Sequence, residues 1–141
     1  MQAFVIGSAL ATAQVLDAKR RNKQCLESRQ IMAAIRGESQ AWRNHPCTLM
    51  YRDHQRWLLA YTMTLSCYQD GDMKRAQRWN RIATATTPPF HTAEYLDNMK
   101  RRLYAKNPQH YFQFAHLGTS DINMYYVDGE WRYYCNGKRL A

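Results

Sequence analysis

Between Gly7 and Gly37 the chain contains neither glycine nor proline. Good helix formers fill this interval, Gly7-Ser8 can cap its start, and Arg36-Gly37 is a typical stop. These signals predict one long helix from Ala9 to Arg36. A chain of 141 residues suffices for one domain with a single core, so a helix of this length strongly constrains how that core is built.

The apolar positions of this helix form one stripe that a polar patch interrupts. At about 100° per residue, the stripe consists of Leu10, Ala13, Leu16, Ile31, Ala34 and Ile35. Through the middle of the helix the same face carries Arg20, Gln24 and Glu27, with Lys23 at its edge. Polar groups on a face that is otherwise buried need hydrogen-bonding partners or a cleft.

The rest of the chain has the pattern of shorter helices followed by a hairpin. The expected helical segments are Thr48–Tyr68, Met73–Ala83, Thr92–Ala105 and a short one, Pro108–His116. Asp128-Gly129 lies between two aromatic stretches and predicts a two-residue hairpin within Tyr125–Tyr134. No repeat or linker divides the chain. We therefore expect an all-α, single domain over residues 1–141 with a small C-terminal aromatic hairpin.

The charge of the chain indicates a polyanionic partner. The chain has twenty Lys and Arg residues and eleven Asp and Glu residues, which gives a formal net charge of +9. Nucleic acid or an anionic surface is the leading partner for such a balance. No run of about 18 apolar residues exists, and the apolar start Ala3–Ile6 is broken by Gly7-Ser8, so we expect neither a membrane span nor a secretory signal. We expect the protein to act inside a cell.

The cysteines and histidines do not have the spacing of a metal site. Four cysteines are spread singly along the chain, at Cys25, Cys47, Cys67 and Cys135. No pair of cysteines has the close spacing of a structural zinc site, so the histidines have no cysteine pair to complete one. We expect reduced cysteines and no metal.

Glu27 is the only acidic residue between Asp17 and Glu38, among six basic ones. The simpler interpretation is an intrahelical ion pair with Lys23, although the basic residue comes first, which is the weaker orientation. The alternative is a catalytic carboxylate in a basic cleft, held ionised by neighbouring cations. The helix alone does not decide between the two.

Several segments, taken in order, resemble a known family. They are Arg20–Gln30, Trp42–Pro46 continuing through Met50–His54, the stretch from His91 through Arg101–Tyr104 to Lys106–Tyr111, and Trp131–Tyr134 with Gly137-Lys138. In this order they resemble the pyrimidine-dimer DNA glycosylases, also called endonuclease V of the dimer-excising type. The resemblance implies a compact helical fold that is both a glycosylase and an abasic-site lyase and needs no metal or organic cofactor.

The resemblance also implies a mechanism and its residues. In the family a free α-amino group at the chain start attacks C1′ of the deoxyribose, which would be the amine of Met1 here. A helix glutamate, Glu27 here, supports the sugar cation and later proton transfers, and the resulting imine collapses by β-elimination. The Met1-Gln2 start departs from the family pattern of a small residue exposed after methionine removal, and a processed Gln2 would block its own amine by cyclisation. If the α-amine is not the nucleophile, Lys19 or Lys23 is the substitute to test.

The remaining candidates are predicted to bind DNA. They are Arg20, Lys23, Gln24, Arg43, His45, His54, His91, Arg101, Arg102, Lys106, Trp131, Arg132, Tyr133, Tyr134 and Lys138. Cations can hold phosphates, and aromatic faces interleaved with cations can stack bases. Structural alternatives stay open: solvated surface charges, a helix cap formed by Asn44-His45-Pro46 with Asn44 as the cap, core histidines, and tail rings that cover the helical core.

The sequence thus predicts a DNA-repair glycosylase with abasic-site lyase activity, directed at ultraviolet-induced pyrimidine dimers. It would act as a monomer on duplex DNA carrying a lesion, in the cytoplasm or nucleoid of a bacterial or phage-infected host. Two alternatives are a glycosylase for another damaged or modified base and a non-catalytic basic DNA-binding module.

Overall fold

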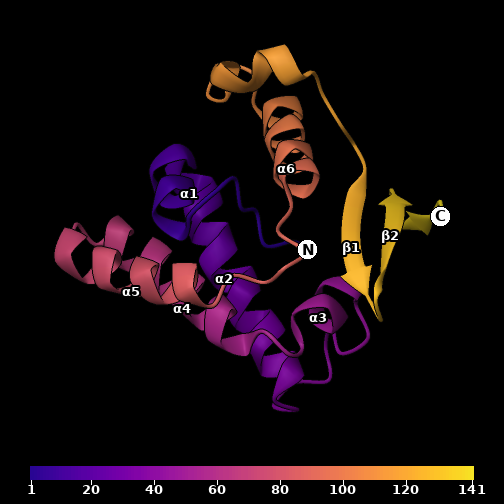
Figure 1. Ribbon diagram of the computed structural model, residues 1–141, viewed down its shortest axis with the longest axis horizontal. Coiled ribbons are helices and arrows are strands. Elements are labelled where there is room, and N and C mark those ends of the chain that lie inside the picture. Colours follow the sequence, from indigo (N-terminus) through magenta and orange to yellow (C-terminus); the bar gives the residue numbers. More distant parts are fainter. The chain divides into compact units, whose positions relative to one another are not determined.

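The computed structural model describes all residues, 1–141, and is mostly helical, with a small antiparallel sheet at the C-terminal end (Figure 1). The chain divides into two compact units, Met1–Pro88 and Pro89–Ala141, which we describe separately. None of the helices combines the length and the apolar character needed to cross a membrane. The mostly helical class is confirmed, whereas the single domain stays a prediction.

The long N-terminal helix predicted from Ala9 to Arg36 is wrong, because the chain breaks at Leu16-Asp17. Helix α1 spans Ala9–Val15 and helix α2 spans Ala18–Ile35. Leu16 has extended backbone angles, and the Asp17 side chain accepts a hydrogen bond from the Arg20 N–H at 3.3 Å. Aspartate is among the best N-cap residues, so Asp17 starts a new helix instead of continuing the first. The uninterrupted run of helix formers around Asp17 hid this break.

Helix α4, Gln55–Gln69, is the centre of the first unit and packs against α1, α2 and α5. The predicted helix Thr48–Tyr68 is also divided, into α3, Pro46–Tyr51, and α4, with a turn between them. Helix α5, Met73–Ala85, follows the predicted Met73–Ala83 closely. The core of this unit includes a stack of Tyr51, Trp57 and Tyr61 with ring centroids 5.3 and 4.9 Å apart.

The second unit consists of one α-helix, one 3-10 helix and the sheet. Helix α6 spans Ala93–Lys106, within one residue of the predicted Thr92–Ala105 at each end. The segment after Pro108 instead forms a 3-10 helix, η1, at Phe112–Leu117. Strands β1, Asn123–Val127, and β2, Glu130–Cys135, pair in antiparallel register and confirm the hairpin. Its turn residues Asp128 and Gly129 both have positive φ, the geometry that a tight hairpin turn requires. A second turn at Asn136-Gly137 adds β3, Lys138–Arg139, which we did not predict.

Candidate active site

The amino-terminal segment of the first unit is buried against α2 and held by one glutamine. Residues 2–5 are each at most 4% exposed. The Gln24 side chain is fully buried, accepts a hydrogen bond from the Phe4 N–H at 2.8 Å and donates one to the Gln2 carbonyl at 3.0 Å. The Tyr61 hydroxyl donates to the same amide oxygen of Gln24 at 3.0 Å. Gln24, which belongs to the polar patch of the predicted helix, is therefore hydrogen-bonded to the first residues of the chain.

Glu27 lies one helical turn beyond Gln24, beside the same segment. One carboxylate oxygen accepts a hydrogen bond from the Gln2 N–H at 3.3 Å, and the other lies 3.9 Å from Nζ of Lys23. The Glu27 side chain is 16% exposed, compared with 56% for Lys23. The ion pair with Lys23 therefore exists, but at a distance that is long for a strong interaction. The carboxylate is mostly buried next to the start of the chain.

The terminal ammonium group also lies within electrostatic reach of α3. His45 is the N-cap of α3, where its Nδ1 accepts the Cys47 N–H at 3.1 Å. The cap is therefore His45 and not Asn44, the residue that the capping interpretation had named. Burial and the nearby terminal ammonium lower the pKa of His45 from 6.5 to about 4. The ring is neutral at pH 7, with Nδ1 as the acceptor and the proton on Nε2.

A buried thiol lies in the field of both proposed catalytic groups. Burial raises the pKa of Cys47 to about 12; the terminal ammonium opposes this shift, and the Glu27 carboxylate adds to it. Cys47 is therefore an uncharged thiol. The amino terminus and Glu27 therefore both lie within electrostatic reach of Cys47, and the amino terminus also lies within reach of His45, all in the first unit.

The depressed pKa of His45 predicts a pH dependence of stability. In the unfolded chain His45 binds a proton near pH 6.5, whereas in the folded protein it does so only near pH 4. The free energy of unfolding should therefore fall as the pH is lowered from about 6.5 to about 4, with no further loss from this group below that range. An NMR titration of the His45 ring should give a midpoint near 4.

The variant His45→Asn is the matched control for this prediction, because asparagine can cap a helix but does not titrate. It should remove part of the stability loss seen between pH 6.5 and 4 while leaving stability at pH 7 nearly unchanged. A His45 midpoint near 6.5 would contradict the prediction.

The other candidates of the first unit have varied surroundings. The Arg20 guanidinium lies over the Phe4 ring, 5.5 Å from its centroid. Arg43 is exposed and donates to Gln40 at 3.1 Å, and His54 is the N-cap of α4, without a side-chain capping bond. DNA contacts by these residues stay predictions, and Gln24 is placed to support the amino-terminal segment.

In the second unit, His91 and Trp131 belong to an aromatic cluster. The His91 ring stacks on Tyr95 at 5.6 Å, and Trp131 lies 5.5 Å from Tyr95 and 5.2 Å from Tyr126. Tyr134 meets Tyr125 edge-on at 5.6 Å. Tyr133 pairs through its backbone with the chain end, at Leu140 and Ala141. The rings of His91, Trp131 and Tyr134 pack within the unit, which favours the structural alternative for them. Base stacking by the tail rings stays a prediction.

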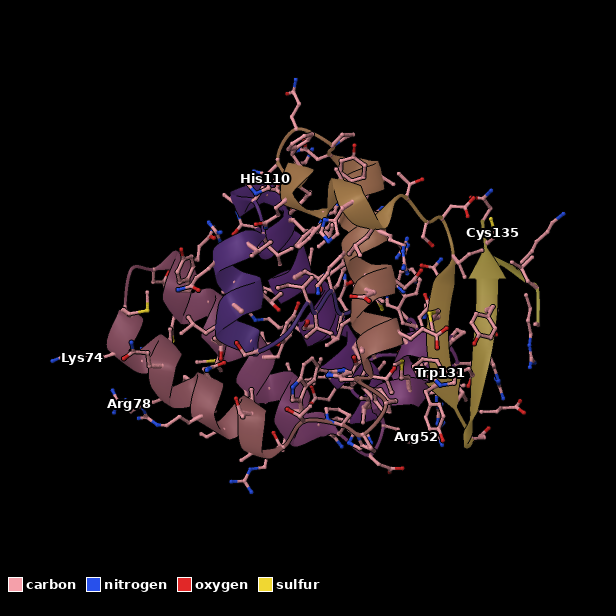
Figure 2. All side chains as sticks on the ribbon, turned by 45° about the horizontal axis from the view of Figure 1, so that its top comes forward. Arg52, Lys74, Arg78, His110, Trp131 and Cys135 are labelled. Atoms are coloured by element: carbon pink, nitrogen blue, oxygen red, sulfur yellow. The ribbon has the colours of Figure 1, made fainter.

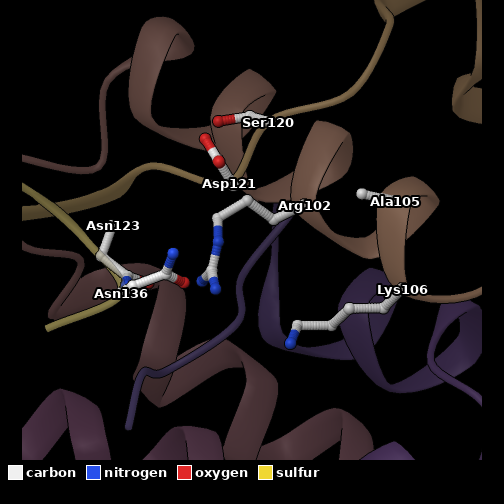
Figure 3. A pocket seen from close by; sticks show the side chains of 7 residues that line it. All are labelled: Arg102, Ala105, Lys106, Ser120, Asp121, Asn123 and Asn136. Carbon is white, nitrogen blue, oxygen red and sulfur yellow. The ribbon is translucent and has the colours of Figure 1, made fainter.

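The cations of the second unit lie in several different surroundings. Arg101 donates to the Leu117 carbonyl at 2.9 Å, and Arg132 forms ion pairs with Asp128 and Glu130. Arg102 and Lys106 extend from α6 into a pocket of about 270 Å³ (Figure 3). Its other lining residues are Ala105, Ser120, Asp121, Asn123 and Asn136. Lys138 is exposed on β3. The pocket, with two cations against one carboxylate, is the part of this unit best suited to an anion.

The cations of α5 are candidates that the sequence motifs did not reveal. The thirteen residues of this helix carry four exposed cations and no acid: Lys74, Arg75, Arg78 and Arg81. Lys74 and Arg78 extend away from the ribbon in Figure 2. None of the four forms an ion pair, and Arg75 and Arg78 line a pocket of about 250 Å³ with Trp79 and Ile82. The helical spacing of Lys74, Arg78 and Arg81 was the signal that could have identified this face.

The comparison with protein families gives one match. Residues 1–67 match the model of the family described as pyrimidine dimer DNA glycosylase. No curated protein and no solved structure matches the chain. The segments from His91 onward, on which the resemblance also rested, lie outside the matched range. Over residues 1–67, which contain the amino terminus, Glu27 and His45, the resemblance to the pyrimidine dimer DNA glycosylases is confirmed.

Proposed function

We propose that this protein is a DNA glycosylase with abasic-site lyase activity that excises pyrimidine dimers, with the Met1 amine as nucleophile and Glu27 as the catalytic carboxylate. One observation carries the proposal. Glu27 binds the backbone of the second residue, while Gln24 holds the same segment from the preceding turn of α2. The chain start is thereby held beside a mostly buried carboxylate, as an amine nucleophile requires.

The chemistry follows from these two groups. The amine lone pair attacks C1′, the C1′–N bond breaks, and the base leaves with the bonding electrons. Glu27 stabilises the positive charge that develops on the sugar. The amine then loses a proton, the sugar ring opens as O4′ takes one, and an imine joins the protein to C1′.

The lyase step breaks the DNA strand. Loss of a proton from C2′ shifts electrons through the imine and expels the 3′ phosphate. Hydrolysis of the imine then frees the amine. Glu27 is the group positioned to carry protons in these steps, since carboxylates serve as general acids and bases.

Borohydride trapping tests the proposal. The protein is incubated with a duplex carrying one thymine dimer, with and without borohydride. We expect strand cleavage without the reductant and a covalent adduct with it, because reduction converts the imine to a stable amine. Mass spectrometry should map the adduct to Met1 and also establish whether Met1 is present.

The controls separate the alternatives. An undamaged duplex and a protein with an acetylated amino terminus should give no adduct. An adduct on Lys19 or Lys23 would assign the role of nucleophile to that lysine. A pyroglutamate at Gln2 would exclude the α-amine as the nucleophile. Salt-sensitive binding with neither adduct nor cleavage would favour another lesion or a non-catalytic binding module.

We propose that α5 supplements the predicted phosphate contacts. Neutralising Lys74, Arg78 and Arg81 together with glutamine should weaken binding to undamaged duplex. The slope of log affinity against log salt should shrink by about 0.9 for each phosphate that the variant no longer binds. Fluorescence anisotropy over a salt series measures this slope.

A charge-matched control tests whether the change in salt dependence comes from α5 itself and not from the lower net charge. The triple variant of Arg29, Arg36 and Arg52 to glutamine removes the same charge from exposed positions outside α5. Equal slopes for the two triple variants would show an effect of net charge alone and would contradict the role of α5.

We further propose that the protein acts inside the cell as a monomer on duplex DNA that carries a lesion. Its net charge of +9 supports sliding along the phosphate backbone. Sedimentation of the complex with a short damaged duplex should give a stoichiometry of one.

A further inference from the structure

Trp42 combines exposure with an unfavourable backbone conformation. Its side chain is 46% exposed, and its φ is +63°. The other non-glycine residues with positive φ are Asp128 and Asn136, which lie in tight hairpin turns where Asp and Asn are favoured. A bulky aromatic residue has no such preference. A ring that is nearly half exposed gains only part of the burial energy of a core tryptophan, while its backbone conformation costs free energy.

The position of Trp42 relates it to the proposed reaction centre. Its ring meets the His45 ring edge-on, with centroids 5.6 Å apart, and its carbonyl accepts the His45 N–H at 3.1 Å. His45 in turn lies within electrostatic reach of the terminal ammonium. The indole therefore contacts a residue whose pKa is influenced by the terminal ammonium, the group that would attack C1′.

We propose that Trp42 is a binding site for an unstacked nucleobase, which its exposed ring face holds when the enzyme opens the duplex at a lesion. The ligand, DNA, comes from the proposed function. A base is bonded directly to C1′, so a base displaced from the duplex stack lies close to any group that reaches C1′. Extrusion leaves two apolar base faces without partners, and an exposed indole can cover one of them.

Glycine at position 42 gives a sharp test, because it removes the ring while accepting positive φ without strain. The probes are two duplexes, one fully paired and one with a single bulged thymine. The wild type should prefer the bulged duplex, and Trp42→Gly should lose about tenfold or more of that preference. Its denaturation midpoint should not fall. Trp42→Phe should keep most of the preference because it keeps a ring.

Phe112→Ala is the matched control, since Phe112 is also an exposed aromatic residue, at 71%. It should leave the preference unchanged. An undiminished preference in Trp42→Gly would overturn the proposal, as would an equal loss in Phe112→Ala. A large fall in the midpoint of Trp42→Gly would also overturn it, by showing that the ring holds the loop together.

Cleavage assays separate this inference from the proposed function. An abasic site has no base to stack, so Trp42→Gly should cleave abasic DNA at nearly the wild-type rate but excise dimers about tenfold more slowly or worse. A parallel loss of both activities would overturn the base-stacking role. Inactivity of the wild type on both substrates would instead contradict the proposed function, while the binding preference would still decide the role of Trp42.

Discussion

Glu27→Gln should lower dimer excision by about 10²- to 10⁴-fold while leaving affinity for the damaged duplex within a factor of about three. Glutamine keeps an oxygen that can accept the Gln2 N–H, which Glu27 now binds at 3.3 Å. The amino-terminal segment should therefore stay in place. What the substitution removes is the negative charge that would stabilise the sugar cation and the capacity to carry a proton.

Single-turnover cleavage of a duplex with one thymine dimer measures this effect, and anisotropy measures the affinity. Glu38→Gln is the matched control, because Glu38 is an exposed acid just beyond α2 and should tolerate the change. If Glu27 served only to pair with Lys23 across 3.9 Å, Glu27→Gln would change neither rate nor affinity. That result would contradict the catalytic assignment.

Gln24→Ala should cause the largest loss of stability, about 2–5 kcal/mol in the free energy of unfolding. Alanine leaves the Phe4 N–H and the Gln2 carbonyl without their present partners inside the unit. It also opens a cavity where a fully buried side chain stood. Because the same bonds hold the chain start beside Glu27, dimer excision should fall as well.

Urea unfolding followed by circular dichroism gives the change in stability. Gln69→Ala removes an equivalent amide from an exposed position on α4, where Gln69 bonds Arg21 and Asn22. This control should cost no more than about 0.5 kcal/mol, as is usual for surface positions. A loss below about 1 kcal/mol for Gln24→Ala would show that Gln24 does not hold the segment.

Local signals in the sequence were enough for several features. Asp128-Gly129 predicted its hairpin because few residue pairs accept positive φ at both positions. Helices α5 and α6 lie where their caps and breakers indicated. Asp17 is a signal of the same kind, because its capping side chain divides the first predicted helix. Asn136-Gly137 likewise signalled the turn that leads to β3.

The helical class, the basic character and the placement of Glu27 on the polar face of a helix could be predicted from the sequence, because charge and helical period are local properties of the chain. The contacts of that face depend on how the folded chain packs. Gln24 meets Phe4 across 20 positions of sequence, and Tyr61 meets Gln24 across 37. No periodicity encodes such contacts, since they depend on how α2 and α4 pack. The strained, exposed Trp42 likewise became visible only once its backbone angle and its neighbour His45 were known.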